Sequence, residues 1–326
     1  MACISWQTRT LASDNLPLIE FSENRVMKSV DYTEYAAKPF GGENVSGRSP
    51  TFRRAAAKAV IDTFLLPYAL LRHRQLRRQG QRVDDHTYTC FLRAPAQLSL
   101  ISGPVLDYLG RGERLEITLL ACSNGAEPYT IASWLAQAVP GLDFHIRASD
   151  LHPEMVARAQ AARYSRDEVL HSEYMTQSFL DATFEEDADG YVVRPEIRAR
   201  VSFSQASLLD GDGLRAEFGQ APLVVAQNVL FHLPPDLAAD ALRNLYSLTK
   251  PGGALLIEGM DLDLRAEVTE QLGLVPFTED LRRVYEETRV HTPLRWWRYY
   301  WGTEPFMHLR PNRSRRYATA FKRPAG

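Results

Sequence analysis

The stretch Leu115–Ala138 constrains the fold most, because it joins a short apolar run, a tight loop and a helical pattern. Leu115–Ala121 is rich in strand-forming residues and has the length of one buried strand. Cys122–Gly125 is small and polar, and Pro128–Ala138 then places its apolar residues on one helical face. A strand, a tight loop and a helix form the first half of a βαβ unit. In open parallel sheets, ligands bind over such loops, at the carboxyl ends of the strands.

The residues of this loop argue against a phosphate-binding site. Neither G-x-G-x-x-G nor G-x-x-x-x-G-K is present there. Glu127 opens the predicted helix, where its carboxylate suits the helix dipole but would repel a pyrophosphate seeking the same amides. An acidic loop favours a ligand with an amine or ribose hydroxyls. S-adenosylmethionine has both and carries no phosphate.

Length, charge and cysteine content limit the kinds of protein that the chain can be. The 326 residues suffice for one large domain or two small ones. We expect a cytoplasmic protein without a membrane partner, since no apolar run approaches about 20 residues and the first residues lack a signal-peptide core. A net charge of −2 gives no global attraction to nucleic acid, so we expect no such partner. The spacing of Cys3, Cys90 and Cys122 predicts neither a metal site nor a disulfide framework.

Residues 121–132, ACSNGAEPYTIA, resemble the first cofactor motif of the CheR-type chemoreceptor glutamate methyltransferases, roughly G-C-S-T-G-E-E-P-Y-S-[IL]-A. Ala121 stands where that family has glycine, and Ala126 replaces its first glutamate. The resemblance implies an α/β fold with a Rossmann-like, seven-stranded class I methyltransferase core, and S-adenosylmethionine as the cofactor. It makes Ala121, Ser123 and Glu127 candidate cofactor contacts.

A second motif precedes the first predicted strand. Residues 87–93, TYTCFLR, resemble the family's N-x-T-x-F-F-R, with Thr87 in place of the asparagine. In the family this segment packs against the cofactor, so Thr87, Thr89 and Arg93 become candidate contacts. Arg93 suits either the methionyl carboxylate or an acidic acceptor, because a guanidinium pairs well with carboxylates. The alternative is a surface arginine before the helix predicted at Pro95–Leu109.

An acid follows the second predicted strand, Asp143–Ser149. In such folds an acid at this place hydrogen-bonds the ribose hydroxyls. Residues 148–152, ASDLH, resemble the family's A-T-D-I-D, which makes Asp150 the first candidate for this contact. Capping the helix predicted at Pro153–Ala162 is a structural role compatible with it.

The adenine side of the site is predicted from a fourth match. Residues 201–209, VSFSQASLL, resemble V-x-F-x-x-x-N-L-L, so Ser207 and Leu208 would border the adenine. The next core strand, Leu223–Asn228, leads into QNVLFH, where the family has R-N-V-L-I-Y. Asn228 matches and is a further candidate contact.

His232 replaces the family's tyrosine just after Asn228, beside the expected methyl group. An imidazole titrates near neutrality and can take a proton from a phenol or an amine, commonly accelerating the reaction about 10²–10⁴-fold. A carboxylate acceptor is already ionised and needs a cationic anchor instead. His232 and Arg93 are therefore the candidate catalytic residues, with a structural histidine as the alternative for His232.

We predict two regions. Residues 1–94 form an N-terminal arm and a basic helical region, for which a solvated surface is favoured over an acidic partner or nucleic acid. Residues 95–326 form the methyltransferase domain, with a small antiparallel insertion at about 174–201 and an aromatic-rich tail at about 260–326. Strand-like patterns occur at Ile197–Phe203 and Tyr317–Lys322. The Trp, Tyr and Arg cluster at 293–306 lines an acceptor pocket or forms an aromatic core.

The resemblance implies methyl transfer from S-adenosylmethionine to an acceptor oxygen, most directly a carboxylate, by analogy with the family's glutamate. The partner would then be a small molecule, a peptide or a protein that carries a carboxylate. Two alternatives stay open. One is a tailoring N- or O-methyltransferase of a small metabolite or peptide, and the other is a regulatory protein that binds the cofactor without turnover. The sequence does not give the oligomeric state.

Overall fold

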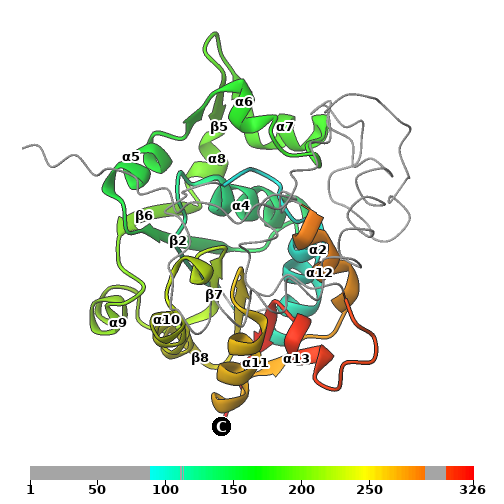
Figure 1. Ribbon diagram of the computed structural model, residues 1–326. Helices are drawn as coiled ribbons and strands as arrows, with labels where there is room; N and C mark the ends of the chain where they lie inside the picture. The colour runs from blue at the N-terminus through cyan, green and yellow to red at the C-terminus, as the bar shows by residue number, and fades with distance from the viewer. Residues whose placement is uncertain (1–88, 111, 113, 291–305) are drawn as a thin grey trace, which may run out of the picture.

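A seven-stranded sheet organises the chain in the computed structural model, which describes residues 89–110, 112, 114–290 and 306–326 (Figure 1). The strand order is β6-β2-β1-β7-β8-β10-β9. The first five strands are parallel, and β10 is antiparallel to both β8 and β9. The predicted α/β fold with a Rossmann-like, seven-stranded core is confirmed. The strands are β1 (Leu115–Leu120), β2 (Phe144–Asp150), β6 (Val201–Gln205), β7 (Ala221–Gln227), β8 (Thr249–Glu258), β9 (Val275–Pro276) and β10 (Ala320–Lys322).

The central strands are nearly continuous apolar runs because helices cover both of their faces. Leu120, at the end of β1, lies opposite Ser149 of β2 and Ala226 of β7. The carboxyl ends of these three strands therefore meet at one edge of the sheet. The loops that follow them come together there.

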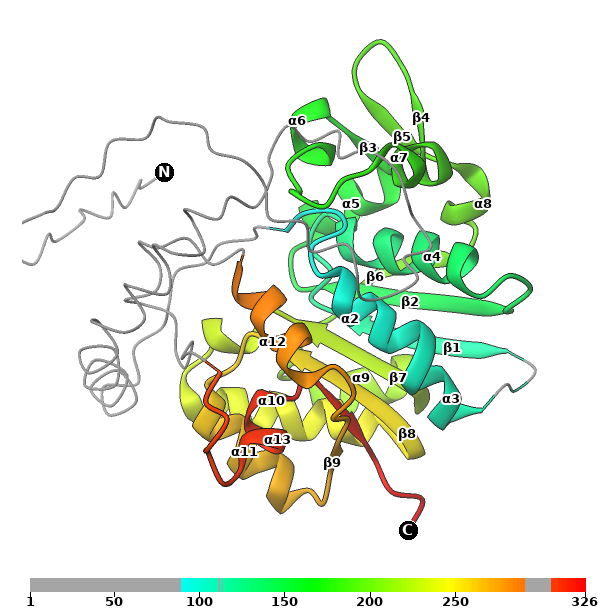
Figure 2. The ribbon, with the colours of Figure 1, turned by 90° about the vertical axis from the view of Figure 1, so that its right-hand side faces the viewer.

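Two groups of helices cover the sheet (Figure 2). One face, which includes Ile117 and Val225, packs against α4 and a continuous helix made of α2, η1 and α3. The other face, which includes Val224 and Ile257, packs against α9, α10 and α11. The helix predicted at Pro95–Leu109 is confirmed. These helices are α2 (Pro95–Leu100), η1 (Ile101–Val105), α3 (Leu106–Leu109), α4 (Ala126–Ala138), α9 (Gly211–Phe218), α10 (Pro235–Leu248) and α11 (Leu262–Gln271).

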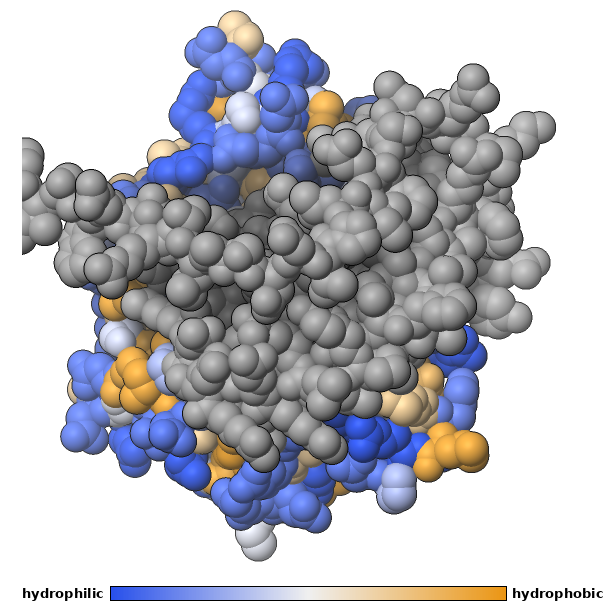
Figure 3. Space-filling model, viewed as in Figure 1, coloured by the Kyte–Doolittle hydropathy of each residue, from blue (hydrophilic) through white to orange (hydrophobic). Residues whose placement is uncertain are grey.

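A small antiparallel sheet, here called the flap (residues 163–193), projects from one end of the main sheet (Figure 1). The part of its surface that Figure 3 shows is mostly hydrophilic. Its inner side is aromatic, and Phe184 packs edge-on against Phe91 with ring centroids 5.0 Å apart. The flap is thereby joined to the segment that contains Arg93. Its elements are β3 (Arg163–Tyr164), α6 (Arg166–Val169), α7 (Gln177–Thr183), β4 (Phe184–Glu186) and β5 (Tyr191–Val193), and α5 (Pro153–Ala161) precedes it.

The structure corrects the predicted strands of this insertion. The small sheet begins at Arg163, ahead of the predicted boundary near residue 174. Ile197 lies in the short helix α8 (Pro195–Arg198), because Pro195 at its first position favours a helix start. The following strand, β6, belongs to the edge of the main sheet.

The C-terminal residues fold back onto the domain. Helix α12 (Leu281–Val290) packs against α2, and the Ala96 amide donates a hydrogen bond to the Glu287 carboxylate (Figure 2). The strand predicted at Tyr317–Lys322 is shorter, because Tyr317 ends helix α13 (Arg313–Tyr317). No described helix is long and apolar enough to cross a membrane. The N-terminal arm, the basic helix, Thr87 and residues 293–305 of the aromatic cluster lie outside the described residues.

Candidate functional site

The carboxyl ends of β1, β2 and β7 open into a pocket of about 170 Å³. All ten predicted site residues that the structure describes line this one pocket. Thr87, the eleventh, lies outside the described residues. The ten residues are Thr89, Arg93, Ala121, Ser123, Glu127, Asp150, Ser207, Leu208, Asn228 and His232.

The loop between β1 and α4 has an unusual backbone. Ala121, Ser123 and Gly125 have positive φ angles of 60°, 50° and 90°. Residues other than glycine rarely adopt this region, and such strain concentrates at functional sites. The φ of Ala121 is one that glycine adopts without strain, in agreement with the glycine at this position of the CheR-type motif.

Asp150 joins the loops that follow β1 and β2. Its carboxylate accepts hydrogen bonds from the backbone amides of Ser123, at 2.7 Å, and His152, at 3.0 Å. The residue is 6% exposed, and it lines the pocket. Each carboxylate oxygen has two lone pairs, so further acceptor capacity is left for a hydroxyl-bearing ligand.

Glu127 lies in the first turn of α4, where the pocket meets the helix. Its Oε1 atom is buried and has no hydrogen-bond partner among the described residues. Burial raises the pKa of Glu127 to about 7; the Arg93 charge opposes this shift, and the Glu258 charge adds to it. A buried acceptor without a partner is suited to a ligand that brings a donor, such as an ammonium group.

Arg93 follows a backbone segment that is held on both sides. The Leu92 amide donates to Thr130 Oγ1 of α4 at 3.1 Å, and the Leu92 carbonyl accepts from Ser172 Oγ at 2.8 Å. Leu92 has a φ of 48°, so these bonds stabilise a strained conformation. The result is a fixed backbone position for Arg93 at the pocket wall.

The loop after β7 lies close against the end of β8. The backbone amide of Asn228 donates a hydrogen bond to the Glu258 carbonyl at 2.8 Å, and that of Phe231 donates one to the Gly259 carbonyl at 2.8 Å. A Cβ on Gly259 would lie 2.6 Å from the Asn228 Cα, so only glycine allows this approach. This packing places His232 in the pocket wall.

Residues 87–276, more than half of the chain, match the family model described as CheR methyltransferase, SAM binding domain. The chain belongs to the CheR methyltransferase family. The matched domain is the family's S-adenosylmethionine-binding domain, so this compound is the cofactor. The match contains β1 to β9 and every predicted site residue.

Three curated relatives illustrate the similarity. The probable biofilm formation methyltransferase WspC of Pseudomonas aeruginosa is 32% identical over 213 residues, 63% of this chain and 49% of that protein. Chemotaxis protein methyltransferase 1 of the same organism is 31% identical over 47% of this chain and 57% of its own length. Chemotaxis protein methyltransferase 2 of Vibrio cholerae is 31% identical over 52% and 60%. The chain spans about half the length of the curated relatives it matches.

Sequence reasoning missed Glu258, a further acid whose charge interacts with Arg93 and Glu127 of the CheR-type pocket. Glu258 ends β8, and burial raises its pKa while the Arg93 and Arg265 charges oppose that shift. The positive charge of Arg93 therefore opposes the rise in the pKa of both Glu127 and Glu258. The available signal was an acid directly after the apolar run Ala254–Ile257, the same signal that identified Asp150. Among the described residues, no group of His, Cys, Asp and Glu is arranged to hold a metal ion.

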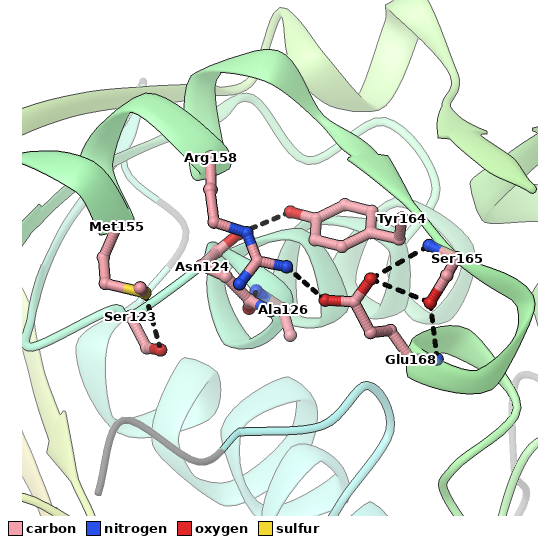
Figure 4. Close-up of polar contacts among 8 residues, drawn as sticks. All are labelled: Ser123, Asn124, Ala126, Met155, Arg158, Tyr164, Ser165 and Glu168. Atoms are coloured by element: carbon pink, nitrogen blue, oxygen red, sulfur yellow. Dashed lines mark hydrogen bonds and ion pairs between the residues drawn. The ribbon is translucent and has the colours of Figure 1, made fainter.

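Helix α5 and the start of the flap pack against the loop between β1 and α4 (Figure 4). The buried Tyr164 hydroxyl donates to the Asn124 carbonyl at 2.6 Å. Beside it, Arg158 of α5 forms an ion pair with Glu168 of α6. The loop that carries Ser123 is thus packed against elements that follow β2, which limits its freedom to move.

We predict that Gly125→Ala will destabilise the fold by about 2–4 kcal/mol, the sum of backbone strain and crowding. Its φ is 90°, and an added Cβ would lie 2.9 Å from the Ala159 Cβ and 3.0 Å from the Tyr164 hydroxyl. Gly141→Ala is the matched control, because Gly141 has a φ of 84° but no atom within 4 Å of the added Cβ. Urea titration gives both free energies of unfolding, and equal losses would contradict a role for close packing at Gly125.

Proposed function

We propose that this chain transfers the methyl group of S-adenosylmethionine to a carboxylate oxygen of its acceptor. The observation that carries this proposal is that all ten described candidate residues line one pocket within the matched domain. The resemblance to the chemoreceptor glutamate methyltransferases supports this acceptor, and relatives named as chemotaxis protein methyltransferases agree with it. The cytoplasm is the compartment we propose, from the sequence alone.

The pocket residues fit the parts of this cofactor. Asp150 would accept hydrogen bonds from the ribose hydroxyls, and Ser207 and Leu208 would border the adenine. Glu127 would accept from the ammonium through its partnerless Oε1 atom. Arg93 supplies the positive charge that this acidic end of the pocket needs.

In this reaction, the pocket residues position the cofactor and the acceptor and exclude water. When bound, S-adenosylmethionine supplies a methyl group on a positively charged sulfur. The pocket must hold the acceptor oxygen in line, about 3–3.5 Å from that carbon. Leu120, Val229 and Leu233 provide apolar walls that keep water away from the reacting charges. A carboxylate with a pKa of about 4 is already ionised at neutral pH, so no residue has to remove a proton.

A phenol or an amine is the second candidate acceptor, because His232 lines the same pocket. In that reaction the imidazole would take the acceptor's proton as the new bond to the methyl carbon forms. The two candidates differ in the chemical stability of the product. A methyl ester is cleaved by alkali, whereas a methylated amine or phenol is not.

We expect the labelled product to release volatile methanol in alkali. The full chain is incubated with methyl-labelled S-adenosylmethionine and an extract of its source cells, and methanol is collected after base treatment. Parallel incubation with Asp150→Ala shows which label depends on this protein. Label that survives alkali would reject the carboxylate and support a phenol or amine acceptor with His232 as the base.

A further inference from the structure

A small cavity of about 30 Å³ adjoins the main pocket. The two share Arg93, Glu127 and Gln227 in their walls, so the small cavity lies directly behind the Glu127 end of the site. Helices α2 and α4 form its other walls, with Gln97 from α2 and Thr130 from α4. Gln97 belongs to none of the motifs found in the sequence.

Two buried polar atoms without partners belong to residues of this cavity wall. Gln97 is 2% exposed, and its Nε2 donor has no hydrogen-bond partner among the described residues. Glu127 Oε1, an acceptor, is buried and lacks a partner in the same part of the chain. Leaving such groups unsatisfied destabilises the fold, so buried polar groups nearly always have partners. A donor and an acceptor on residues of one cavity wall suit an occupant that offers both.

The amino-acid end of S-adenosylmethionine offers this combination on one carbon atom. Its ammonium is a donor that suits Glu127, and its carboxylate is an acceptor that suits an amide N–H. Arg93 in the shared wall adds a positive charge for the same carboxylate. The apolar and thiol neighbours Cys90, Ala94, Leu98 and Ile131 keep this end of the site shielded from water.

We propose that Gln97 is a cofactor-binding residue, whose Nε2 donates a hydrogen bond to the carboxylate at the amino-acid end of S-adenosylmethionine. This inference rests on the cofactor use in the proposed function. It gives the small cavity a ligand and satisfies the Gln97 amide and the Glu127 carboxylate together.

Hydrogen bonds hold the backbone around Gln97 in place. Pro95 opens α2, and the next amide, that of Ala96, is bonded to Glu287 of α12. The backbone amide of Gln97 donates a hydrogen bond to the Ala94 carbonyl at 3.0 Å. A buried side chain on a fixed backbone segment loses less conformational entropy on binding than an exposed one, which favours affinity.

The test compares two ligands on the wild type and three variants. Calorimetry measures the binding of S-adenosylhomocysteine, which has the amino-acid end, and of 5′-methylthioadenosine, which lacks it. For Gln97→Met, which keeps the size but removes the donor, we expect affinity for S-adenosylhomocysteine to fall about 5- to 50-fold, with methylthioadenosine unchanged. Gln97→Glu should weaken S-adenosylhomocysteine further, because it places a negative charge beside the ligand carboxylate. Gln271→Met, at an exposed site of α11, is the matched control and should behave as the wild type.

The outcomes separate this inference from the proposed function. Equal losses for both ligands, or no loss for either, would mean that an ordered water or nothing binds at Gln97, and would overturn the inference. Stronger binding by Gln97→Glu would place the ammonium there and overturn it as well. A wild-type chain that binds neither ligand would refute the proposed function itself. If Gln97→Met fails to fold, the sign of the Gln97→Glu effect still decides.

Discussion

Replacing Asp150 with alanine will weaken S-adenosylhomocysteine binding by about 10- to 150-fold, the equivalent of about 1.5–3 kcal/mol for hydrogen bonds to a charged group. The variant loses the proposed bond to the ribose. It also releases the amides of Ser123 and His152, which both donate to this carboxylate. Calorimetry with purified wild-type and variant protein measures the difference directly.

Two further variants serve as controls for the Asp150→Ala result. Asp150→Asn keeps one acceptor oxygen for the backbone amides, so we expect it to bind more tightly than Asp150→Ala. Asp143→Ala removes an exposed carboxylate just before the same strand and should bind as the wild type does. Unchanged affinity in Asp150→Ala would remove this residue from the cofactor site.

The affinity for S-adenosylhomocysteine will increase with pH until about pH 7 and then level off. The ligand ammonium binds the ionised form of Glu127, whose pKa burial raises to about 7. Below that pH the carboxyl must lose a proton before it can pair, which weakens binding up to about tenfold per pH unit. Calorimetry between about pH 5.5 and 8 gives the profile.

Glu127→Gln removes the titrating group, so its binding will be weak and nearly independent of pH over this range. Glu270→Gln, on the exposed side of α11, should keep the wild-type profile. The free protein should show the opposite trend in stability. Because the folded state favours protonated Glu127, this group's contribution is complete below its ordinary pKa and is lost as the pH rises through about 7. A flat wild-type affinity profile would contradict a direct contact between Glu127 and the ammonium.

The fold and the outline of the pocket could be predicted from local patterns together with the resemblance to the CheR-type family. Asp150 and Asn228 stand at the ends of apolar runs, and parallel strands bring such ends to one edge of a sheet. Glu127 follows a small polar loop that leads into a helix. Each of these signals lies within about ten neighbouring residues, so no knowledge of distant contacts is needed.

Other features depend on packing between distant segments, and local patterns do not show them. Gln97 has the spacing of an ordinary helix residue, and its burial results from the packing of α2 against α4. Glu287 accepts a hydrogen bond from the backbone amide of Ala96, which lies 191 residues away in the chain. The strand predicted at Ile197–Phe203 starts too early, since Ile197 lies in the helix Pro195–Arg198.

The position of β10 has a consequence for the order in which the protein matures on the ribosome. This strand lies between β8 and β9, although β9 precedes it in the chain by more than forty residues. Until residues 320–322 leave the exit tunnel, β8 has an open edge and β9 has no neighbour in the described sheet. An unpaired edge strand of a nascent chain is a site for aggregation and for chaperone binding. The sheet can therefore be completed only after residues 320–322 have been translated and have left the tunnel.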